Sequence, residues 1–262
     1  MSEVTSHEPG TPSFIDLATT DLEAAKHFYG ELFGWDSQDM PAGDHGTYTM
    51  LSKRGKDVAG AYEMSPEMAA QGMPPSWTSY ITVADVDAAA MAVTASGGTV
   101  VSGPLDAEGA GRMAVAQDPT GATFAMWQAK ASIGSYLVNE PGALMWTELQ
   151  TTDTVACEAF YAEVFGWKTE TTDMPTGPYT SFLLGDRAVA GMMAIQPEWG
   201  PVPPNWAIYL AVEDCDALIE RAVAMGGSLE MEPMDVPEAG RFALLQDPQG
   251  AHFFIMTAPN GA

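Results

Sequence analysis

The chain contains an internal duplication, and this feature constrains its fold more than any other. Three short motifs occur twice, in the same order along the sequence. They are Phe28–Trp35 repeated at Phe160–Trp167, Pro75–Trp77 repeated at Pro204–Trp206, and Asp118–Ala122 repeated at Asp247–Ala251. Self-similarity of this kind is the signature of repeated structural units. We therefore expect two copies of one domain.

The two copies define the domain organisation. A chain of 262 residues is long enough for about two domains. The motifs place the first domain at 10–130 and the second at 142–258, with a linker at 131–141. Gly134, Asn139 and Pro141 fall in this linker, and such residues are typical of loops.

Each half is predicted to contain two modules of one helix and several strands. In the first module an apolar stretch at 14–18 predicts a strand, and Asp21 is a favourable N-cap. Apolar spacing predicts a helix at 22–33, which Gly34 ends. The second module repeats this order and closes with a hairpin at 118–121. The sequence therefore predicts an α+β architecture of four βαββ(β) modules.

Acidic residues far outnumber basic ones, which limits the partners of the protein. The chain has 10 Lys and Arg against 35 Asp and Glu, for a formal net charge of −25. Affinity for nucleic acid depends mainly on Lys and Arg that neutralise phosphates, and anionic membranes attract basic segments. We therefore expect no nucleic acid and no membrane as partner. The acidic surface favours solubility, or alternatively attracts cationic ligands.

The sequence also indicates a location in the cell. Cys157 and Cys215 form no Cys-x-x-Cys motif and no disulfide framework, which suits a reducing compartment. The first ten residues lack the basic and apolar regions of a signal peptide. No run approaches the ~20 apolar residues of a membrane span. We expect a soluble, cytoplasmic protein that is a monomer or a homodimer.

These motifs carry a resemblance to a known family. A strand, an Asp-Leu-Glu-Ala-Ala helix start at 21–25, a Phe-Gly-Trp ending at Trp35 and the Asp-Pro-Thr-Gly-Ala hairpin at 118–122 resemble the vicinal oxygen chelate superfamily of glyoxalases, bleomycin-resistance proteins and dioxygenases. The resemblance covers nearly the whole chain, twice. The tandem form is similar to actinobacterial glyoxalase-like or "hydroxylase" proteins, some from aromatic-polyketide (anthracycline) pathways. It implies tandem domains, each of two βαβββ modules with strands curled around a cavity.

The resemblance also indicates where metal-dependent relatives hold their ion. The corresponding positions here are Phe14, Gly60, Thr78 and Ala125 in the first half and Trp146, Gly191, Ala207 and Phe254 in the second. Phenylalanine, tryptophan, alanine and glycine side chains cannot ligate a divalent ion, and one threonine hydroxyl is not a site. We therefore expect no metal and no other cofactor in either half.

Strand alternation then predicts which side chains face each cavity. These ligand-binding candidates are Phe14, Asp16, Tyr80 and Trp127 in the first half and Trp146, Glu148, Tyr209, His252 and Phe254 in the second. Aromatic side chains with a few polar groups are typical of a small-molecule site. Alternatively, the aromatic side chains close the cavity as core.

Asp16 and Glu148 are the most informative candidates, because an acid occurs at the equivalent place in both halves. Each could bind the amine or hydroxyl of a ligand. Each could instead pair with Arg112 or Arg241, which also occupy equivalent positions. Both interpretations stay open at this point.

Three functions are compatible with these residues. The first is metal-independent binding of an aromatic or cationic small molecule, for sequestration, antibiotic resistance or as an accessory of a biosynthetic pathway. The second is a metal-independent enzyme that uses Tyr80, Tyr209, Asp16 or Glu148 for acid–base steps on a polyketide-like substrate. The third is a glyoxalase-type lyase, which requires a metal ion.

Overall fold

The structure, a computed structural model, describes residues 3–43, 46–107, 109–174, 177–236 and 240–257. Each half forms one eight-stranded sheet with helices on its outer side. The elements of the first half are β1 (Pro12–Thr19), α1 (Leu22–Phe33), β2 (Asp36–Pro41), β3 (Thr47–Lys53), β4 (Lys56–Glu63), α2 (Pro66–Ala70), β5 (Ser76–Thr82), α3 (Val86–Ala95), β6 (Thr99–Ala107), β7 (Gly111–Gln117) and β8 (Thr123–Ala129).

The second half repeats this order, apart from the short helix α2, which a 3-10 turn at Pro197–Trp199 replaces. Its elements are β9 (Leu144–Thr151), α4 (Thr154–Phe165), β10 (Lys168–Met174), β11 (Gly177–Leu184), β12 (Arg187–Ala194), β13 (Asn205–Val212), α5 (Cys215–Ala224), β14 (Ser228–Val236), β15 (Gly240–Gln246) and β16 (His252–Thr257). The four βαβββ modules expected from the sequence are confirmed.

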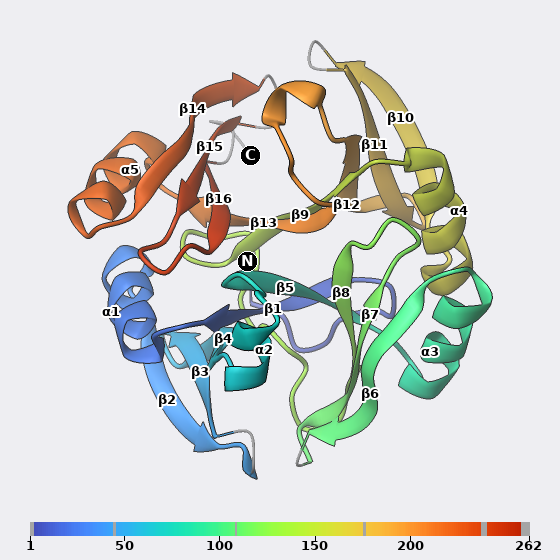
Figure 1. The fold of residues 1–262 in the computed structure, drawn as a ribbon, viewed down its shortest axis with the longest axis horizontal. Coiled ribbons are helices and arrows are strands. Elements are labelled where there is room, and N and C mark those ends of the chain that lie inside the picture. Colours follow the sequence, from blue (N-terminus) through green and yellow to red (C-terminus); the bar gives the residue numbers. More distant parts are fainter. Residues whose placement is uncertain (1–2, 44–45, 108, 175–176, 237–239, 258–262) are drawn as a thin grey trace.

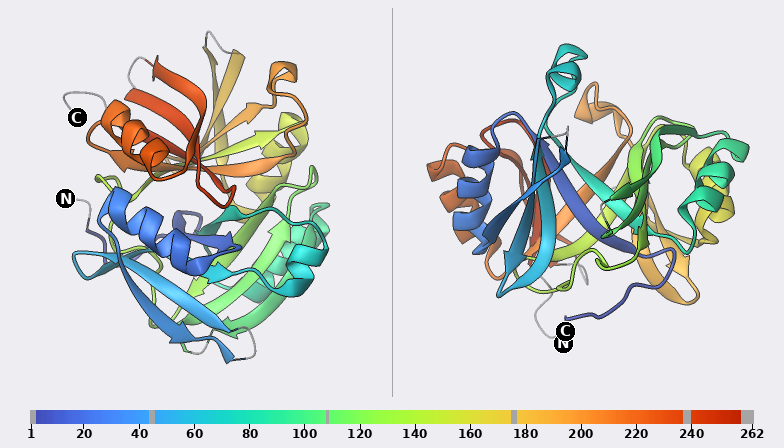
Figure 2. Two further views of the ribbon diagram at one scale, coloured as in Figure 1. Left: turned by 60° about the vertical axis from the view of Figure 1, so that its left-hand side comes forward. Right: turned by 90° about the horizontal axis from the view of Figure 1, so that it is seen from below.

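The two sheets have the same topology. The strand order is β2-β3-β4-β1-β5-β8-β7-β6 in the first and β10-β11-β12-β9-β13-β16-β15-β14 in the second. The modules of one half meet where β1 pairs antiparallel with β5, and where β9 pairs with β13. Figure 2 shows that each sheet curls, so that its face opposite the helices is concave.

Local signals in the sequence explain the long helices. The Asp21 side chain accepts a hydrogen bond from the backbone N–H of Ala24 at the start of α1, and Asp153 caps α4 in the same way. Each helix ends at a glycine with a left-handed backbone, Gly34 at φ 68° and Gly166 at φ 71°. Glycine adopts this conformation without the steric penalty of a Cβ atom.

The hydrophobic core is shared between the two halves. Figure 1 shows α1 beside α5 on one side of the molecule and α3 beside α4 on the other. One buried cluster joins the first module to the fourth, and another joins the second module to the third. Trp77 and Trp206, which end one of the repeated motifs, are buried in these two clusters. The four long helices α1, α3, α4 and α5 therefore each pack against a module of the other half.

The repeated motifs meet at this junction. The hydroxyl of Tyr29 donates to Asp247 at 2.9 Å, and the hydroxyl of Tyr161 donates to Asp118 at 3.0 Å. The Phe-Tyr motif of each half thus contacts the Asp-Pro hairpin of the other half, which accounts for the recurrence of both motifs.

Within the described residues, no helix is long and apolar enough to cross a membrane.

Candidate functional site

The concave face of the first sheet gathers the predicted residues. In the pairing of β1 with β5, Phe14 lies opposite Tyr80 and Asp16 lies opposite Thr78. Tyr80 in turn lies beside Ala125 of β8. Phe14, Tyr80, Ala125 and Trp127 form a buried cluster separate from the two helix-facing cores. The strand alternation assumed from the sequence is therefore correct for these side chains.

Asp16 lies at the centre of this cluster and is only 2% exposed. Its Oδ2 accepts a hydrogen bond of 2.6 Å from the hydroxyl of Tyr80, and the Tyr48 side chain also hydrogen-bonds to it. Burial raises the pKa of the Asp16 carboxyl to about 7, because desolvation outweighs the hydrogen bonds that lower it. Near neutral pH this group can therefore act as a hydrogen-bond donor, an acceptor or a base.

Burial also raises the pKa of the Tyr80 phenol well above its usual value, and the charge of Asp16 adds to the effect. The phenol thus keeps its proton, so Tyr80 remains a hydrogen-bond donor at neutral pH. The ring of Phe14 meets the ring of Tyr80 edge to face, with 5.8 Å between the centroids. The indole of Trp127 donates to the carbonyl of Ser132 at 3.0 Å.

The second sheet carries an equivalent but distinct cluster. Oε1 of Glu148 accepts from the hydroxyl of Tyr209 at 3.2 Å and from the amide of Gln150 at 3.3 Å. Burial is the largest effect on the pKa of Glu148 and raises it above its usual value. The ring of Phe254 stacks on that of Tyr209 with 4.4 Å between the centroids. Each half therefore holds a buried carboxyl beside tyrosine hydroxyls and aromatic rings.

A tyrosine hydroxyl occupies the space beside a glycine in each half. A Cβ atom added at Gly60 would lie 1.9 Å from the hydroxyl of Tyr48, and one at Gly191 would lie 1.9 Å from the hydroxyl of Tyr179. In the pairing of β12 with β9, Gly191 lies beside Glu148, as Gly60 of β4 lies beside Asp16. Any side chain here would displace the tyrosine.

Tyr48 and Tyr179 were not among the residues predicted from the sequence. They come from β3 and β11, strands that carry none of the positions expected to hold a metal. The sequence nevertheless contained a signal for them, because the pair Tyr48 and Gly60 recurs as Tyr179 and Gly191 in the second copy. The indole of Trp146 donates to the hydroxyl of Tyr179 at 2.9 Å, which links this predicted residue to the second cluster.

The residues at the expected metal positions do not fit a divalent ion. Phe14, Ala125, Trp146 and Phe254 are apolar, and tyrosine hydroxyls fill the space beside the two glycines. Across the part of the chain that the structure describes, no three His, Cys, Asp or Glu side chains gather where they could hold a metal. Each concave face offers a single buried carboxyl, which is too few donors for such a site.

Of the two interpretations left open for Asp16 and Glu148, pairing with Arg112 or Arg241 does not agree with the structure. Arg112 pairs with Asp87 and Asp106 instead. Met113 packs against the concave cluster, so its neighbour Arg112 lies on the opposite face of β7.

Arg241 likewise lies on the strand face opposite the concave cluster. It pairs with Asp216 and Asp235, because its neighbour Phe242 occupies the concave face of β15. The hydrogen-bond partners of the two buried acids are therefore tyrosine and amide groups rather than arginines.

His252 differs from the other predicted residues. It is exposed at the start of β16, and its ring lies 3.3 Å from the side-chain nitrogen of Gln246. The structure gives it no hydrogen bond to Glu148 or Tyr209 among the described residues. It is thus the one predicted site residue that is exposed.

Comparisons with known proteins agree with the geometry. The family model described as "Glyoxalase/Bleomycin resistance protein/Dioxygenase superfamily" matches residues 11–126 and 143–254. The chain is 43% identical over 258 residues to "Putative glyoxylase CFP32" of Mycobacterium tuberculosis (strain CDC 1551 / Oshkosh), covering 98% of both chains. It is 37% identical over 268 residues to "Anthracycline biosynthesis protein DnrV" of Streptomyces peucetius, covering 98% of this chain and 97% of that protein.

Solved structures show the same fold at low sequence identity. The Mn(II)-bound glyoxalase from Novosphingobium aromaticivorans superposes with a TM-score of 0.64 at 16% identity, over 95% of this chain and 82% of that one. The 2,3-dioxygenase LapB from Pseudomonas sp. KL28 superposes with a TM-score of 0.64 at 13% identity, over 97% of this chain and 94% of that one.

Proposed function

The chain belongs to the glyoxalase/bleomycin resistance protein/dioxygenase superfamily, and from this premise we propose that it binds an aromatic small molecule on its concave sheet faces without a metal ion. The observation that carries the proposal is the position of the Tyr48 and Tyr179 hydroxyls. They fill the space beside Gly60 and Gly191 and point to the buried acids. Hydrogen-bonding groups replace a metal-ligand set at the same place in the fold.

The lining supports an aromatic ligand. Partly buried side chains surround each cluster and leave apolar surface on the concave face, including Met50 and Met113 in the first half and Trp146 and Phe242 in the second. Methionine adapts its shape to flat ring systems, and aromatic rings stack on them. A buried carboxyl among such groups is the kind of polar anchor that orients a ligand in an apolar pocket.

The relatives suggest the ligand class and the biological role. One relative is named for anthracycline biosynthesis, and anthracyclines are polycyclic aromatic compounds. A net charge of −25 attracts a ligand that carries an amine. The function proposed is therefore sequestration of, or resistance to, an aromatic natural product, or an accessory role in its biosynthesis. We also propose that it acts in the reducing environment of the cytoplasm.

A second candidate function is metal-independent catalysis at Asp16. Burial raises the pKa of this carboxyl to about 7, within the range in which a general base works best at neutral pH. The Tyr80 phenol, which donates to Asp16 at 2.6 Å, could turn this donor to a substrate oxygen on which negative charge develops once Asp16 has taken up a proton. This arrangement suits proton transfer on a polyketide-like substrate. A glyoxalase-type lyase is the least supported alternative, because it needs a metal-ligand set.

The experiment that tests the binding function uses daunorubicin, an anthracycline with an amino sugar. Binding is followed by quenching of the ligand's fluorescence with wild-type protein, Asp16→Asn and Glu148→Gln. A charge-assisted hydrogen bond contributes about 1.5–3 kcal/mol, so the variant at the occupied face should bind about ten- to a hundredfold more weakly. Glu163→Gln, which removes an exposed acid on α4, is the matched control.

Two results would contradict the proposal. One is daunorubicin affinity that is unchanged in both variants. The other is co-purification of a divalent metal at about one ion per half, with loss of binding after chelation. Mass spectrometry of the released ligand separates binding from catalysis, because only an enzyme returns a chemically altered compound.

A further inference from the structure

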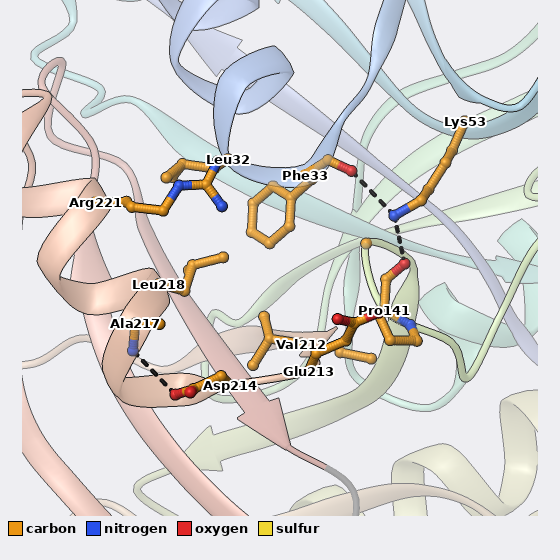
Figure 3. Close-up of a pocket in the computed structure, with 12 residues that line it drawn as sticks. Leu32, Phe33, Lys53, Pro141, Val212, Glu213, Asp214, Ala217, Leu218 and Arg221 are labelled. Carbon is orange, nitrogen blue, oxygen red and sulfur yellow. Dashed lines mark hydrogen bonds between the residues drawn. The ribbon is translucent and has the colours of Figure 1, made fainter.

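A hollow of about 280 Å³ lies between the two halves, away from both concave faces. Figure 3 shows that α1, α5 and the segment at Pro141 surround it. Its floor is apolar and includes Leu32, Phe33, Val212 and Leu218. A volume near the lower end of the roughly 300–1,000 Å³ usual for ligand pockets suits a small molecule.

Two basic side chains face each other across this floor. Figure 3 shows Lys53 on one side and Arg221 on the other. Lys53 donates to the carbonyls of Phe33 and Pro141 at 3.1 and 2.7 Å, and Arg221 donates to the carbonyl of Glu31. Neither makes an ion pair with a carboxylate among the described residues. Most other basic side chains do so, namely Lys26, Arg54, Lys56, Arg112, Lys130, Arg187 and Arg241.

Acids complete the charge pattern. Glu213 and Asp214 also line the hollow. Asp214 caps α5 by accepting from the backbone N–H of Ala217, whereas Glu213 has no such hydrogen bond among the described residues. Burial lowers the pKa of the Lys53 ammonium, the charge of Arg54 adds to this effect, and the carboxylates of Glu140 and Glu213 partly oppose it. Lys53 is therefore a partly buried cation that a further carboxylate in the hollow would stabilise.

The internal duplication provides a natural control for these charges. The place equivalent to Gly142 is Gly10, since the indole of Trp35 donates to the Gly142 carbonyl and that of Trp167 donates to the Gly10 carbonyl. Where the first junction has Lys53, Glu213 and Arg221, the equivalent residues are Leu184, Ala84 and Ala92. The fold therefore forms this junction without these three charges, which appear together at only one of the two places.

We propose that the hollow is a binding site for a small zwitterion, an α-amino acid with an apolar side chain. Its carboxylate would lie at Lys53, its ammonium at the nearby Glu213, and its side chain on Leu32, Phe33 and Leu218, with Arg221 on the far side of the floor. A free anion is repelled by a chain of net charge −25, whereas a net-neutral zwitterion is not. The apolar floor contributes by removing hydrocarbon from water.

The test uses L-leucine and a local reporter. Trp35 contacts Gly142, a residue of the hollow, so the NMR signal of its indole N–H reports on occupancy. Adding L-leucine to the full-length ¹⁵N-labelled protein should shift the Trp35 signal saturably and leave the Trp167 signal in place. Absence of a saturable shift up to the solubility limit, or equal movement of both signals, would overturn the proposal.

Variants and analogues identify the recognised groups. Lys53→Leu and Arg221→Ala introduce the residue types of the equivalent junction. Lys53→Leu should weaken L-leucine binding roughly tenfold or more, and Arg221→Ala, on the far side of the floor, should weaken it less. Lys53→Gln keeps a donor for the two carbonyls and should weaken binding as much as Lys53→Leu, which guards against a folding defect. Lys168→Leu removes an exposed charge elsewhere and should change nothing.

The analogues 4-methylpentanoate and 3-methylbutylamine lack the ammonium and the carboxylate of leucine respectively. Each should bind at least roughly tenfold more weakly than leucine. Equal binding of 4-methylpentanoate would show an ordinary anion site and refute recognition of a zwitterion. A loss of affinity in Lys168→Leu as large as that in Lys53→Leu would likewise refute the assignment to the hollow.

Discussion

The hydroxyl of Tyr29 donates a hydrogen bond of 2.9 Å to Oδ2 of Asp247, and the two residues belong to opposite halves of the chain. Tyr29 is fully buried and also accepts from the indole of Trp77 at 3.1 Å. The other oxygen of Asp247 accepts the backbone N–H groups that close its hairpin. One phenol thus connects a helix of the first module to a turn of the fourth.

Replacing Tyr29 with phenylalanine should destabilise the protein by about 1–3 kcal/mol, because a buried carboxylate oxygen loses its donor. Tyr161→Phe should have a similar effect, since Tyr161 donates to Asp118 in the equivalent place. Urea denaturation measures both. Tyr136→Phe is the control, because its hydroxyl makes no hydrogen bond among the described residues. Wild-type stability in Tyr29→Phe would show that this contact contributes nothing.

Neither half should form a stable monomer when expressed alone. Each of the two large buried clusters takes side chains from both halves, so a separate half would expose apolar helix and sheet surfaces. Circular dichroism of residues 1–130 alone should show no cooperative unfolding transition. A mixture of residues 1–130 and 142–262 should show such a transition. An isolated half that sediments as a compact, folded monomer in analytical ultracentrifugation would contradict this prediction.

The buried acid Asp16 should make stability depend on pH. Burial raises its pKa from 3.8 to about 7, so between these values the folded chain binds a proton that the unfolded chain has lost. The contribution of Asp16 to the free energy of unfolding should therefore decrease by about 1.4 kcal/mol per pH unit from pH 4 to 7 and level off above.

Asp16→Asn removes this titration, so the stability of the variant relative to wild type should increase over the same range. Urea denaturation at several pH values measures the difference. Asp36→Asn, at an exposed acid on β2, serves as the control. A constant difference between Asp16→Asn and wild type from pH 4 to 7 would refute the raised pKa.

A methyl group at Gly60 should disturb the first cluster. The Cβ atom of Gly60→Ala would overlap the Tyr48 hydroxyl, at a cost of about 1–3 kcal/mol for overpacking. Combining it with Tyr48→Ala removes the overlap, so the double variant should be more stable than the sum of the single effects predicts. A double-mutant cycle from denaturation curves gives the coupling free energy. Simple additivity would show that the two residues do not interact.

The sequence predicted the concave cluster well because strands alternate their faces. Alternation placed Asp16 on the same face of its strand as Phe14, and Tyr80 on the same face of its strand as Thr78. In the structure Phe14 lies opposite Tyr80 and Asp16 lies opposite Thr78. The same alternation applied to Arg112 would have shown that it lies on the opposite face from Met113. Pairing with Arg112 stayed open as an alternative because the similar positions of the two arginines in the two copies were considered and the strand period was not.

Contacts between the halves could not be predicted from the sequence. The apolar faces of α1 and α4 are suited to any module of this fold, because duplication gives all modules similar inner surfaces. Nothing in the pattern specifies whether Tyr29 meets the hairpin at Asp118 or the one at Asp247. Only the three-dimensional arrangement shows that it contacts the hairpin of the other half.

The connection at 131–141 has a consequence for how the shared cores behave on dilution. If the halves were separate chains, their association would depend on protein concentration, and dilution would separate them. A short covalent connection makes the encounter intramolecular, with an effective concentration in the millimolar range. The helix pairs α1–α5 and α3–α4 therefore stay together at any cellular abundance of the protein. Because the two linked halves need not be identical, their concave faces can differ in sequence. They already differ at one buried acid, which is Asp16 in the first half and Glu148 in the second.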